Sequence, residues 1–367
     1  MRELSVDSKK GRNLIVTPYI LVAPILKNLN GRSQNMNAVK LLTIVTLSVF
    51  SASTLTGAQS IKQKREIADH LQDVSVTIKA KAKYSSSEGS GAMIIREIDG
   101  KKVTFVWTAA HVVDNLRKVR SVIEGGTPVK LIEFSDASIV KELVEKGRRV
   151  GEMKMDAKVI KYSDYRDGHD LALLMVRATD YAKSGVEFNL SKDNDGIIPI
   201  GTDLIHVGSL LGQMGANSMT KGIVSQVGRT LDKYEYDQTT VTAFPGSSGG
   251  GVYLENGKYV GMIVRGAGEG FNLMVPVRRM IEWAEKNDIM WAIDPKEEMP
   301  SLDEILSMQI EDSGIVRSAD DGDDEKSLQK TFPFRIKILP HERGKTSERV
   351  LKQLPFEDFT PKFELKY

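Results

Sequence analysis

A serine inside a turn bounded by glycines is the residue of this chain best suited to act as a nucleophile. It is Ser248, in the run Phe244-Pro245-Gly246-Ser247-Ser248-Gly249-Gly250. Because glycine has no Cβ, Gly246 can adopt a positive φ and turn its amide inward. The N–H groups of Gly246 and Ser248 can then converge where the oxyanion of a tetrahedral intermediate would lie. The pattern predicts acyl transfer at Ser248; the alternative is a flexible, solvated turn.

A serine hydroxyl is a weak nucleophile unless a nearby base removes its proton. The sequence supplies such a base in His111, which follows residues 105–110, where an apolar β-type run breaks into small residues. Packing at a strand end can hold the imidazole away from solvent. We interpret His169 as a loop residue, and we expect surface or hydrogen-bonded histidines at the remaining positions, which are His70, His206 and His341.

An aspartate at the start of a second apolar strand can orient this base. Asp170 opens the run over residues 170–174, directly before Leu171. A carboxylate at the mouth of an apolar strand is partly buried, which is unfavourable unless a cation or an N–H group meets it. An imidazole N–H is such a partner. An isolated aspartate here would be a simple turn residue, but with Ser248 and His111 it completes one mechanism.

The three motifs resemble a known family in type and in order. Residues 108–111, 170–174 and 246–250 resemble the His, Asp and Ser series of trypsin-like serine endopeptidases, in the chymotrypsin order. The similarity to the bacterial HtrA/Deg group extends to further short segments, at residues 89–91, 218–225, 228–229 and 259–262. The resemblance covers about residues 72–288.

This resemblance implies an all-β fold of two six-stranded antiparallel β-barrels, chymotrypsin-like, with a C-terminal helix and the active site between the barrels. It implies that His111 acts first as base and then as acid, that Asp170 fixes its tautomer, and that Ser248 forms the acyl-enzyme. No cofactor and no metal are expected. The expected partners are protein or peptide substrates, without nucleic acid, and a homo-oligomer is left open.

Three further residues are expected to bind the substrate. Thr242 lies six residues before Ser248, where this family places the floor of its primary specificity pocket. Because threonine lacks the charge that cleavage after Lys or Arg requires, we expect a small or medium apolar residue before the cleaved bond. Val264 and Gly266 are expected on a free strand edge, to which an extended substrate can add by main-chain hydrogen bonds.

Two alternatives compete with a serine endopeptidase. One is a catalytically weak protein of protease fold that binds peptides, and the other is a protein that processes only its own terminal segments. Both stay open at this point, because a fold alone does not guarantee a function.

Composition excludes several other classes of protein. The chain has 367 residues, of which 41% are hydrophobic and 27% charged, and its formal net charge is +2. A nearly balanced charge gives no overall field that would favour nucleic acid. The chain has no cysteine, which excludes disulfides and thiol chemistry. No zinc-type spacing of histidine and cysteine occurs either.

Residues 1–60 are expected to precede the folded domain. Within them, residues 36–58 have a basic start, about ten apolar residues and then small residues, which is typical of a signal peptide. We therefore expect a periplasmic or secreted protein, with a membrane anchor formed by the same segment as the alternative. Whether translation starts at Met1 or Met36 stays open.

The protease domain is expected over residues 61–288. It should contain a lead-in helix (61–71), barrel one (about 72–180), a crossing (178–200), barrel two (about 200–277) and a closing helix (277–287). A strand at 74–80 and a hairpin that turns at residues 99–100 should begin barrel one. Residues 138–149 have the spacing of a short amphipathic helix, which predicts a surface decoration on that barrel.

The end of the chain is expected to lack a fold. Residues 289–367 are predicted to be an acidic linker and a largely disordered tail, because residues 320–325 form an acidic cluster among few aromatic residues. HtrA relatives usually carry a PDZ domain here, and we expect none, because this tail is too short and too polar.

Overall fold

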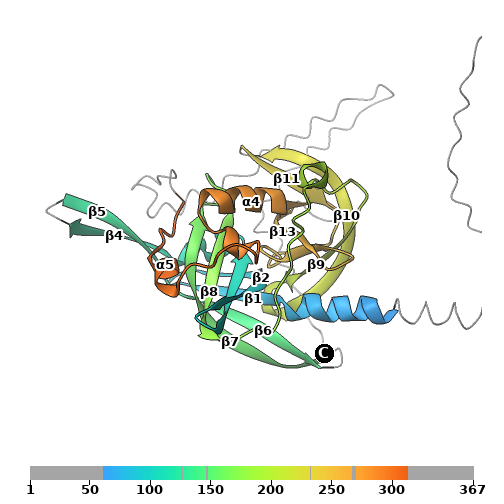
Figure 1. The fold of residues 1–367 in the computed structure, drawn as a ribbon, viewed down its shortest axis with the longest axis horizontal. Helices are drawn as coiled ribbons and strands as arrows, with labels where there is room; N and C mark the ends of the chain where they lie inside the picture. The colour runs from blue at the N-terminus through green and yellow to red at the C-terminus, as the bar shows by residue number, and fades with distance from the viewer. Residues whose placement is uncertain (1–60, 125–126, 146–147, 232, 267–269, 313–367) are drawn as a thin grey trace, which may run out of the picture. The chain divides into compact units, whose positions relative to one another are not determined.

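Two six-stranded antiparallel sheets, each closed on itself, form the body of the protein (Figure 1). The structure is a computed structural model that describes residues 61–312 apart from 125–126, 146–147, 232 and 267–269. The first barrel has the strand order β1-β2-β3-β8-β7-β6 and the second the order β10-β11-β14-β13-β12-β9. The rings are completed by the pairs β1 with β6 and β9 with β10. The predicted all-β architecture is confirmed.

The first barrel contains β1 (Ser75–Lys81), β2 (Ser86–Ile98), β3 (Lys101–Thr108), β6 (Ala137–Glu145), β7 (Arg148–Ser163) and β8 (Leu171–Thr179). The second contains β9 (Asp203–Leu210), β10 (Gly215–Leu231), β11 (Tyr234–Thr239), β12 (Gly251–Leu254), β13 (Tyr259–Gly266) and β14 (Asn272–Pro276). A separate two-stranded sheet joins β4 (Arg117–Glu124) to β5 (Thr127–Phe134). Besides a helix at residues 61–73, the helices are α3 (Ala110–Val113), α4 (Val277–Lys286) and α5 (Leu302–Ser307). The short 3-10 turns are η2 (Asp114–Leu116), η3 (Asp193–Gly196), η4 (Gly212–Met214) and η5 (Met290–Ala292).

Local turn chemistry and aromatic packing account for the start and the closure of the first barrel. Asp99 and Gly100 both have positive φ, 51° and 72°, which suits the tight turn between two right-twisted strands. On β3, Trp107 is fully buried. Its ring centroid lies 5.9 Å from that of Trp283 in α4, and its indole N–H donates to the carbonyl of Ala292 at 3.0 Å. The predicted closing helix is therefore confirmed, and its Trp283 packs against Trp107 of barrel one.

The helix predicted over residues 138–149 is wrong. These residues belong to β6 and to the start of β7. The spacing of apolar residues fits a helix, but β6 pairs with β7 along one edge and with β1 along the other. Ile139 and Val140 are both buried, at 0% and 2% exposure. Closure of the barrel needs this strand, and helix propensity is a weak preference that tertiary pairing overrides.

The disordered tail predicted from residue 289 is wrong for its first part. Trp291 in η5 is buried, and α5 begins with a capping box in which Ser301 and Glu304 satisfy each other's backbone N–H groups. Ile305 of this helix is also buried, and the carbonyl of Ile310 accepts a hydrogen bond from the N–H of Tyr162 at 2.8 Å. Residues 313–367 lie outside the described part.

Two further segments lie before β1 and between β8 and β9. Residues 61–73 are helical, and between β8 and β9 the described chain has the short turn η3 and an isolated bridge from Phe188 to Tyr259. The hairpin of β4 and β5 projects from the first barrel and had no predicted counterpart (Figure 1). No helix in the described part of the chain is long and apolar enough to cross a membrane. The signal-peptide prediction at residues 36–58 falls outside the described residues.

Candidate active site

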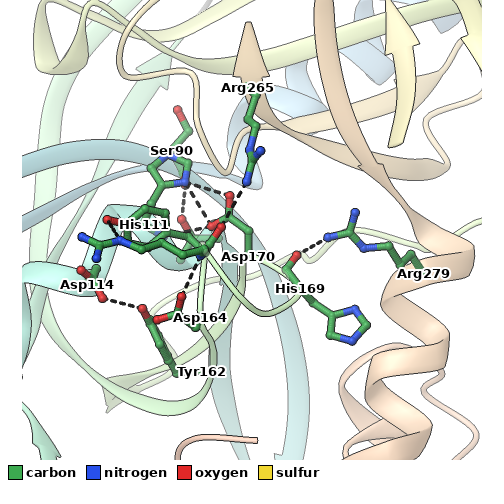
Figure 2. A network of polar contacts seen from close by, with 12 residues as sticks. Ser90, His111, Asp114, Tyr162, Asp164, His169, Asp170, Arg265 and Arg279 are labelled. Carbon is green, nitrogen blue, oxygen red and sulfur yellow. Dashed lines mark hydrogen bonds and ion pairs between the residues drawn. The ribbon is translucent and has the colours of Figure 1, made fainter. Parts of the chain in front are cut away.

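His111 and Asp170 face each other, one on α3 and the other directly before β8 (Figure 2). The ring Nδ1 of His111 lies 3.0 Å from Oδ2 of Asp170 and 3.1 Å from Oδ1. The backbone N–H of His111 also donates to Oδ1, at 3.0 Å. The carboxylate thus contacts both the backbone and the ring of the histidine. When Nδ1 carries the proton in this contact, Nε2 has a free lone pair and can act as a base.

Asp170 occupies a strained position that its loop enforces. Its φ is 56°, a conformation that aspartate tolerates better than most residues because its short side chain can hydrogen-bond locally. Its side chain is 1% exposed, compared with 29% for His111. Within the loop, the carboxylate of Asp164 accepts the N–H groups of Arg166 and Asp167 at 2.7 and 3.1 Å. The buried carboxylate of Asp170 itself is met by the backbone N–H and the ring of His111 rather than by solvent.

The turn that carries Ser248 lies against strand β2, close to the helix that carries His111. The N–H of Ser90 donates to the carbonyl of Ser248 at 2.7 Å. A Cβ built on Gly89 would lie 2.5 Å from the side chain of Val112 and 3.0 Å from the carbonyl oxygen of Ser248. Gly89 therefore separates the two segments. No hydrogen bond between described residues reaches Ser248 Oγ, and such contacts often form only when substrate binds.

Two backbone N–H groups in the Ser248 turn are left without an acceptor. The N–H groups of Ser247, Gly249 and Gly250 each donate to a backbone carbonyl, those of Phe244, Ile263 and Ser247 in turn, at 2.7 to 2.9 Å. The N–H groups of Gly246 and Ser248 have no acceptor among the described residues. These are the two donors predicted for the oxyanion hole.

The orientation of both donors follows from the planarity of the peptide unit. In a trans peptide the carbonyl and the following N–H point in opposite directions. The carbonyl of Pro245 accepts the N–H of Leu211 at 2.8 Å, and that of Ser247 accepts the N–H of Gly250 at 2.9 Å. Both carbonyls are thus tied to the protein, which turns the N–H groups of Gly246 and Ser248 the other way.

Gly246 is required for this turn by its conformation and by its surroundings. Its φ is 96°, and a Cβ would lie 2.4 Å from the carbonyl oxygen of Ser209. The hydroxyl of Ser90 donates to the carbonyl of Gly246 at 2.7 Å and accepts the N–H of Ser209 at 2.7 Å. Side chains from barrel one therefore help to hold the turn of barrel two.

Two of the predicted substrate-binding residues, Val264 and Gly266, lie on β13 beyond its pairing with β12. Pairing of β13 with β12 reaches Met262, whereas pairing with β14 continues to Gly266. The described pairing with β12 does not extend to Val264 or Gly266. The Val264 side chain is buried and Gly266 is exposed. Thr242 is half-buried, and its carbonyl accepts the hydroxyl of Thr220 at 2.9 Å.

Sequence reasoning missed a set of contacts by which barrel two holds the loop of residues 164–170. The hydroxyl of Tyr234 donates to the carbonyl of Asp167 at 2.9 Å, and the guanidinium of Arg265 donates to that of Tyr165 at 3.1 Å. Arg279 reaches from α4 to the carbonyl of His169, next to Asp170 (Figure 2). These contacts join distant segments, and no local pattern in the sequence indicates them.

Arg279 is the most buried member of this set, at 5% exposure. Its guanidinium also donates to the carbonyl of Glu235 at 2.8 Å and lies 4.4 Å from the ring centroid of Tyr236. Replacing Arg279 by Met would leave two carbonyls without this donor, so we expect the free energy of unfolding to fall by about 3 kcal/mol. Urea denaturation measures this. Lys286→Met, on the exposed face of the same helix, is the control and should change the midpoint little; an equal midpoint for both variants would contradict the assignment.

Two other histidines, His206 and His169, lie outside the contact between His111 and Asp170. His206 on β9 is fully buried, with Nδ1 3.0 Å from the carbonyl of Gly251. Burial lowers its pKa to about 4, so it is neutral near pH 7. His169 lies in the loop, as predicted, with its ring 4.7 Å from that of Tyr234. Among the described residues, no group of three or more His, Cys, Asp or Glu side chains is arranged to hold a metal ion.

Comparison with known proteins shows what this arrangement resembles. Residues 89–262, which include His111, Asp170 and Ser248, match the model of the trypsin-like peptidase domain. This part of the chain is therefore similar to trypsin-like peptidase domains. Its two six-stranded antiparallel sheets and C-terminal helix are typical of the chymotrypsin fold.

A curated bacterial protease is among the proteins to which this chain is similar. The chain is 29% identical over 186 residues to "Serine protease Do-like HtrA" of Lactococcus lactis subsp. cremoris (strain MG1363), a match that covers 48% of this chain and 37% of that protein. The chain therefore spans less than half the length of this relative. A solved structure, the serine endoprotease from Yersinia pestis, aligns with a TM-score of 0.44 and 16% identity, over 61% of this chain and 65% of that one.

Proposed function

We propose that this protein is a serine endopeptidase in which Ser248 is the nucleophile. His111 is the base and then the acid, Asp170 orients it, and the N–H groups of Gly246 and Ser248 form the oxyanion hole. The single observation that carries the proposal is the pair of N–H groups without acceptors in a turn whose other N–H groups are bonded. The family match and the contact between His111 and Asp170 support it.

Each step of the proposed reaction uses a group of this chain. Nε2 of His111 removes the proton of Ser248 Oγ as this oxygen attacks the carbonyl carbon, and the carbonyl electron pair moves to oxygen, toward the two N–H groups. His111 then gives the proton to the amide nitrogen, the C–N bond breaks and the acyl-enzyme remains. Water attacks the ester in the same way, its proton passes through His111, and Ser248 is regenerated.

We propose extended or unfolded protein segments as the substrates. The edge of β13 at Val264 and Gly266, beyond its pairing with β12, would accept a peptide backbone of any sequence as an additional strand. Thr242 carries no charge, which favours a small or medium apolar residue before the cleaved bond. Incubation with a casein-type substrate, followed by mass spectrometry of the fragments, tests both parts. Cleavage mainly after Lys or Arg would contradict the preference, and no cleavage of any added protein would contradict the endopeptidase itself.

The pH dependence of turnover should reflect the contact between His111 and Asp170. Burial acts to lower the pKa of His111, but the charge and the hydrogen bond of Asp170 outweigh it, so the pKa is raised above 6.5. Only the neutral imidazole can act as the base, so kcat/KM should be low in acid and rise as pH passes through this raised pKa. A pH profile of kcat/KM measures it. An acid limb centred clearly below pH 6.5 would contradict the expectation.

A further inference from the structure

A strained turn lies directly beside the predicted oxyanion hole. Leu211 has a φ of 63°, in the left-handed region that costs roughly 1–2 kcal/mol for a residue with a Cβ. Its side chain is 52% exposed, so burial of this side chain does not offset the strain. Strain of this kind persists only where the surroundings determine the conformation, and it is concentrated at functional sites.

Hydrogen bonds on both sides of Leu211 hold this turn. The N–H of Leu211 itself donates to the carbonyl of Pro245 at 2.8 Å, which is the bond that turns the N–H of Gly246 toward the substrate side. Two residues later, the N–H of Gln213 donates to Oε2 of Glu88 at 3.0 Å. One bond therefore orients the Gly246 amide, and the other ties the turn to the first barrel.

Glu88 is built into this contact. It lies on β2, two residues before Ser90, and its side chain is 42% exposed. Gly212 has a φ of 67°, and a Cβ there would lie 2.2 Å from Oε2 of Glu88, so only glycine lets the carboxylate approach the turn. The opposite oxygen, Oε1, lies 3.7 Å from Nζ of Lys79. The two oxygens of Glu88 thus have different partners: Oε2 accepts the N–H of Gln213, and Oε1 forms an ion pair with Lys79. Such a solvent-accessible ion pair contributes little to stability.

We propose that Glu88 is a positioning residue for the oxyanion hole. Its carboxylate holds the N–H of Gln213, this fixes the left-handed turn at Leu211, and the N–H of Leu211 fixes the Pro245 carbonyl so that the N–H of Gly246 faces the substrate. Glu88 does not touch the substrate. The inference rests on the proposed endopeptidase activity and adds to it a residue from the opposite barrel that the sequence motifs do not include.

The test compares Glu88→Ala with Glu88→Gln and with Glu97→Ala. Removing a whole oxyanion donor lowers kcat about 10²–10³-fold, so loosening one donor is expected to lower kcat by about tenfold. In Glu88→Ala we expect this loss with KM unchanged, together with a similar loss of affinity for a peptide boronic acid, whose adduct is tetrahedral. Glu88→Gln retains an oxygen that can accept the Gln213 N–H, so it should recover most of kcat. Glu97 is exposed on the same strand, opposite Lys102, and serves as the matched control.

The outcomes separate this inference from the proposed function. Equal kcat in Glu88→Ala and Glu97→Ala, a rise in KM alone, or a loss that Glu88→Gln does not recover would each overturn the role of Glu88. A thermal midpoint measured for every variant identifies a loss that comes from unfolding, which would also overturn it. Failure of the endopeptidase proposal would appear differently, as turnover by the unmodified chain that Ser248→Ala leaves unchanged.

Discussion

Replacing Ser248 by Ala should lower kcat on an unfolded protein substrate by about 10⁶-fold. The reason is that His111 and Asp170 act on a reaction that begins with attack by this hydroxyl, so neither contributes once it is removed. The residual rate should be that of water attack assisted by the N–H groups of Gly246 and Ser248. Quenched single-turnover assays at high enzyme concentration can measure such a low rate.

The control for Ser248 is its neighbour in the same turn. Ser247 is buried, and its hydroxyl accepts the N–H of Phe244 at 3.1 Å. Ser247→Ala should therefore affect the free energy of unfolding more than it affects kcat. His111→Ala should lose about as much kcat as Ser248→Ala, and the double variant should lose no more, because the residues act as a unit. Retention of more than about a hundredth of kcat in Ser248→Ala would contradict the assignment, since a true nucleophile has no substitute.

Asp170→Asn should lower kcat by about 10⁴-fold. The amide is nearly the same size as the carboxylate. Its oxygen can still accept the backbone N–H of His111, which in the unmodified protein donates to Oδ1 at 3.0 Å. However, an amide can also donate to Nδ1 and so favour the wrong tautomer of the ring, and it cannot stabilise the imidazolium. The loss should appear in kcat with the fold intact.

The same variant should also move the pH profile. Asp170 raises the pKa of His111 against the effect of burial, so its removal leaves burial dominant and should lower that pKa. The acid limb of kcat/KM should therefore shift to lower pH. Asp114→Asn removes another carboxylate of this region, one that accepts the hydroxyl of Tyr162 at 2.6 Å; it should keep most of kcat. A similar loss in both variants would indicate a general effect of charge rather than a relay through Asp170.

Local patterns were sufficient to predict most of the fold. Alternating apolar residues and the turn at Asp99 and Gly100 place the first strands correctly, and the spacing in residues 277–286 predicts α4. Residues 138–149 misled because their apolar spacing fits a helix, whereas the strand there is dictated by partners at residues 77–79 and 148–157. The helix α5 was missed because it is short and is held by one capping box and one buried side chain, Ile305.

The residues of the candidate site also divide into those that the sequence predicts and those that it does not. His111, Asp170 and Ser248 each belong to a short motif, so their types and order can be recognised without a structure. Arg279, Tyr234 and Glu88 act on these motifs from segments far away in the chain, through single contacts to backbone groups. A contact of a side chain with a backbone carbonyl or N–H does not constrain the partner's residue type, so it leaves no trace in the sequence.

Labelling with a fluorophosphonate tests the central claim most directly, because this reagent phosphonylates a serine hydroxyl only when a base and an oxyanion site activate it. Peptide mapping by mass spectrometry should find one adduct, on Ser248, in the unmodified chain. The adduct should be lost in Ser248→Ala and strongly slowed in Asp170→Asn. An unlabelled Ser248 in the folded, unmodified protein would contradict the account.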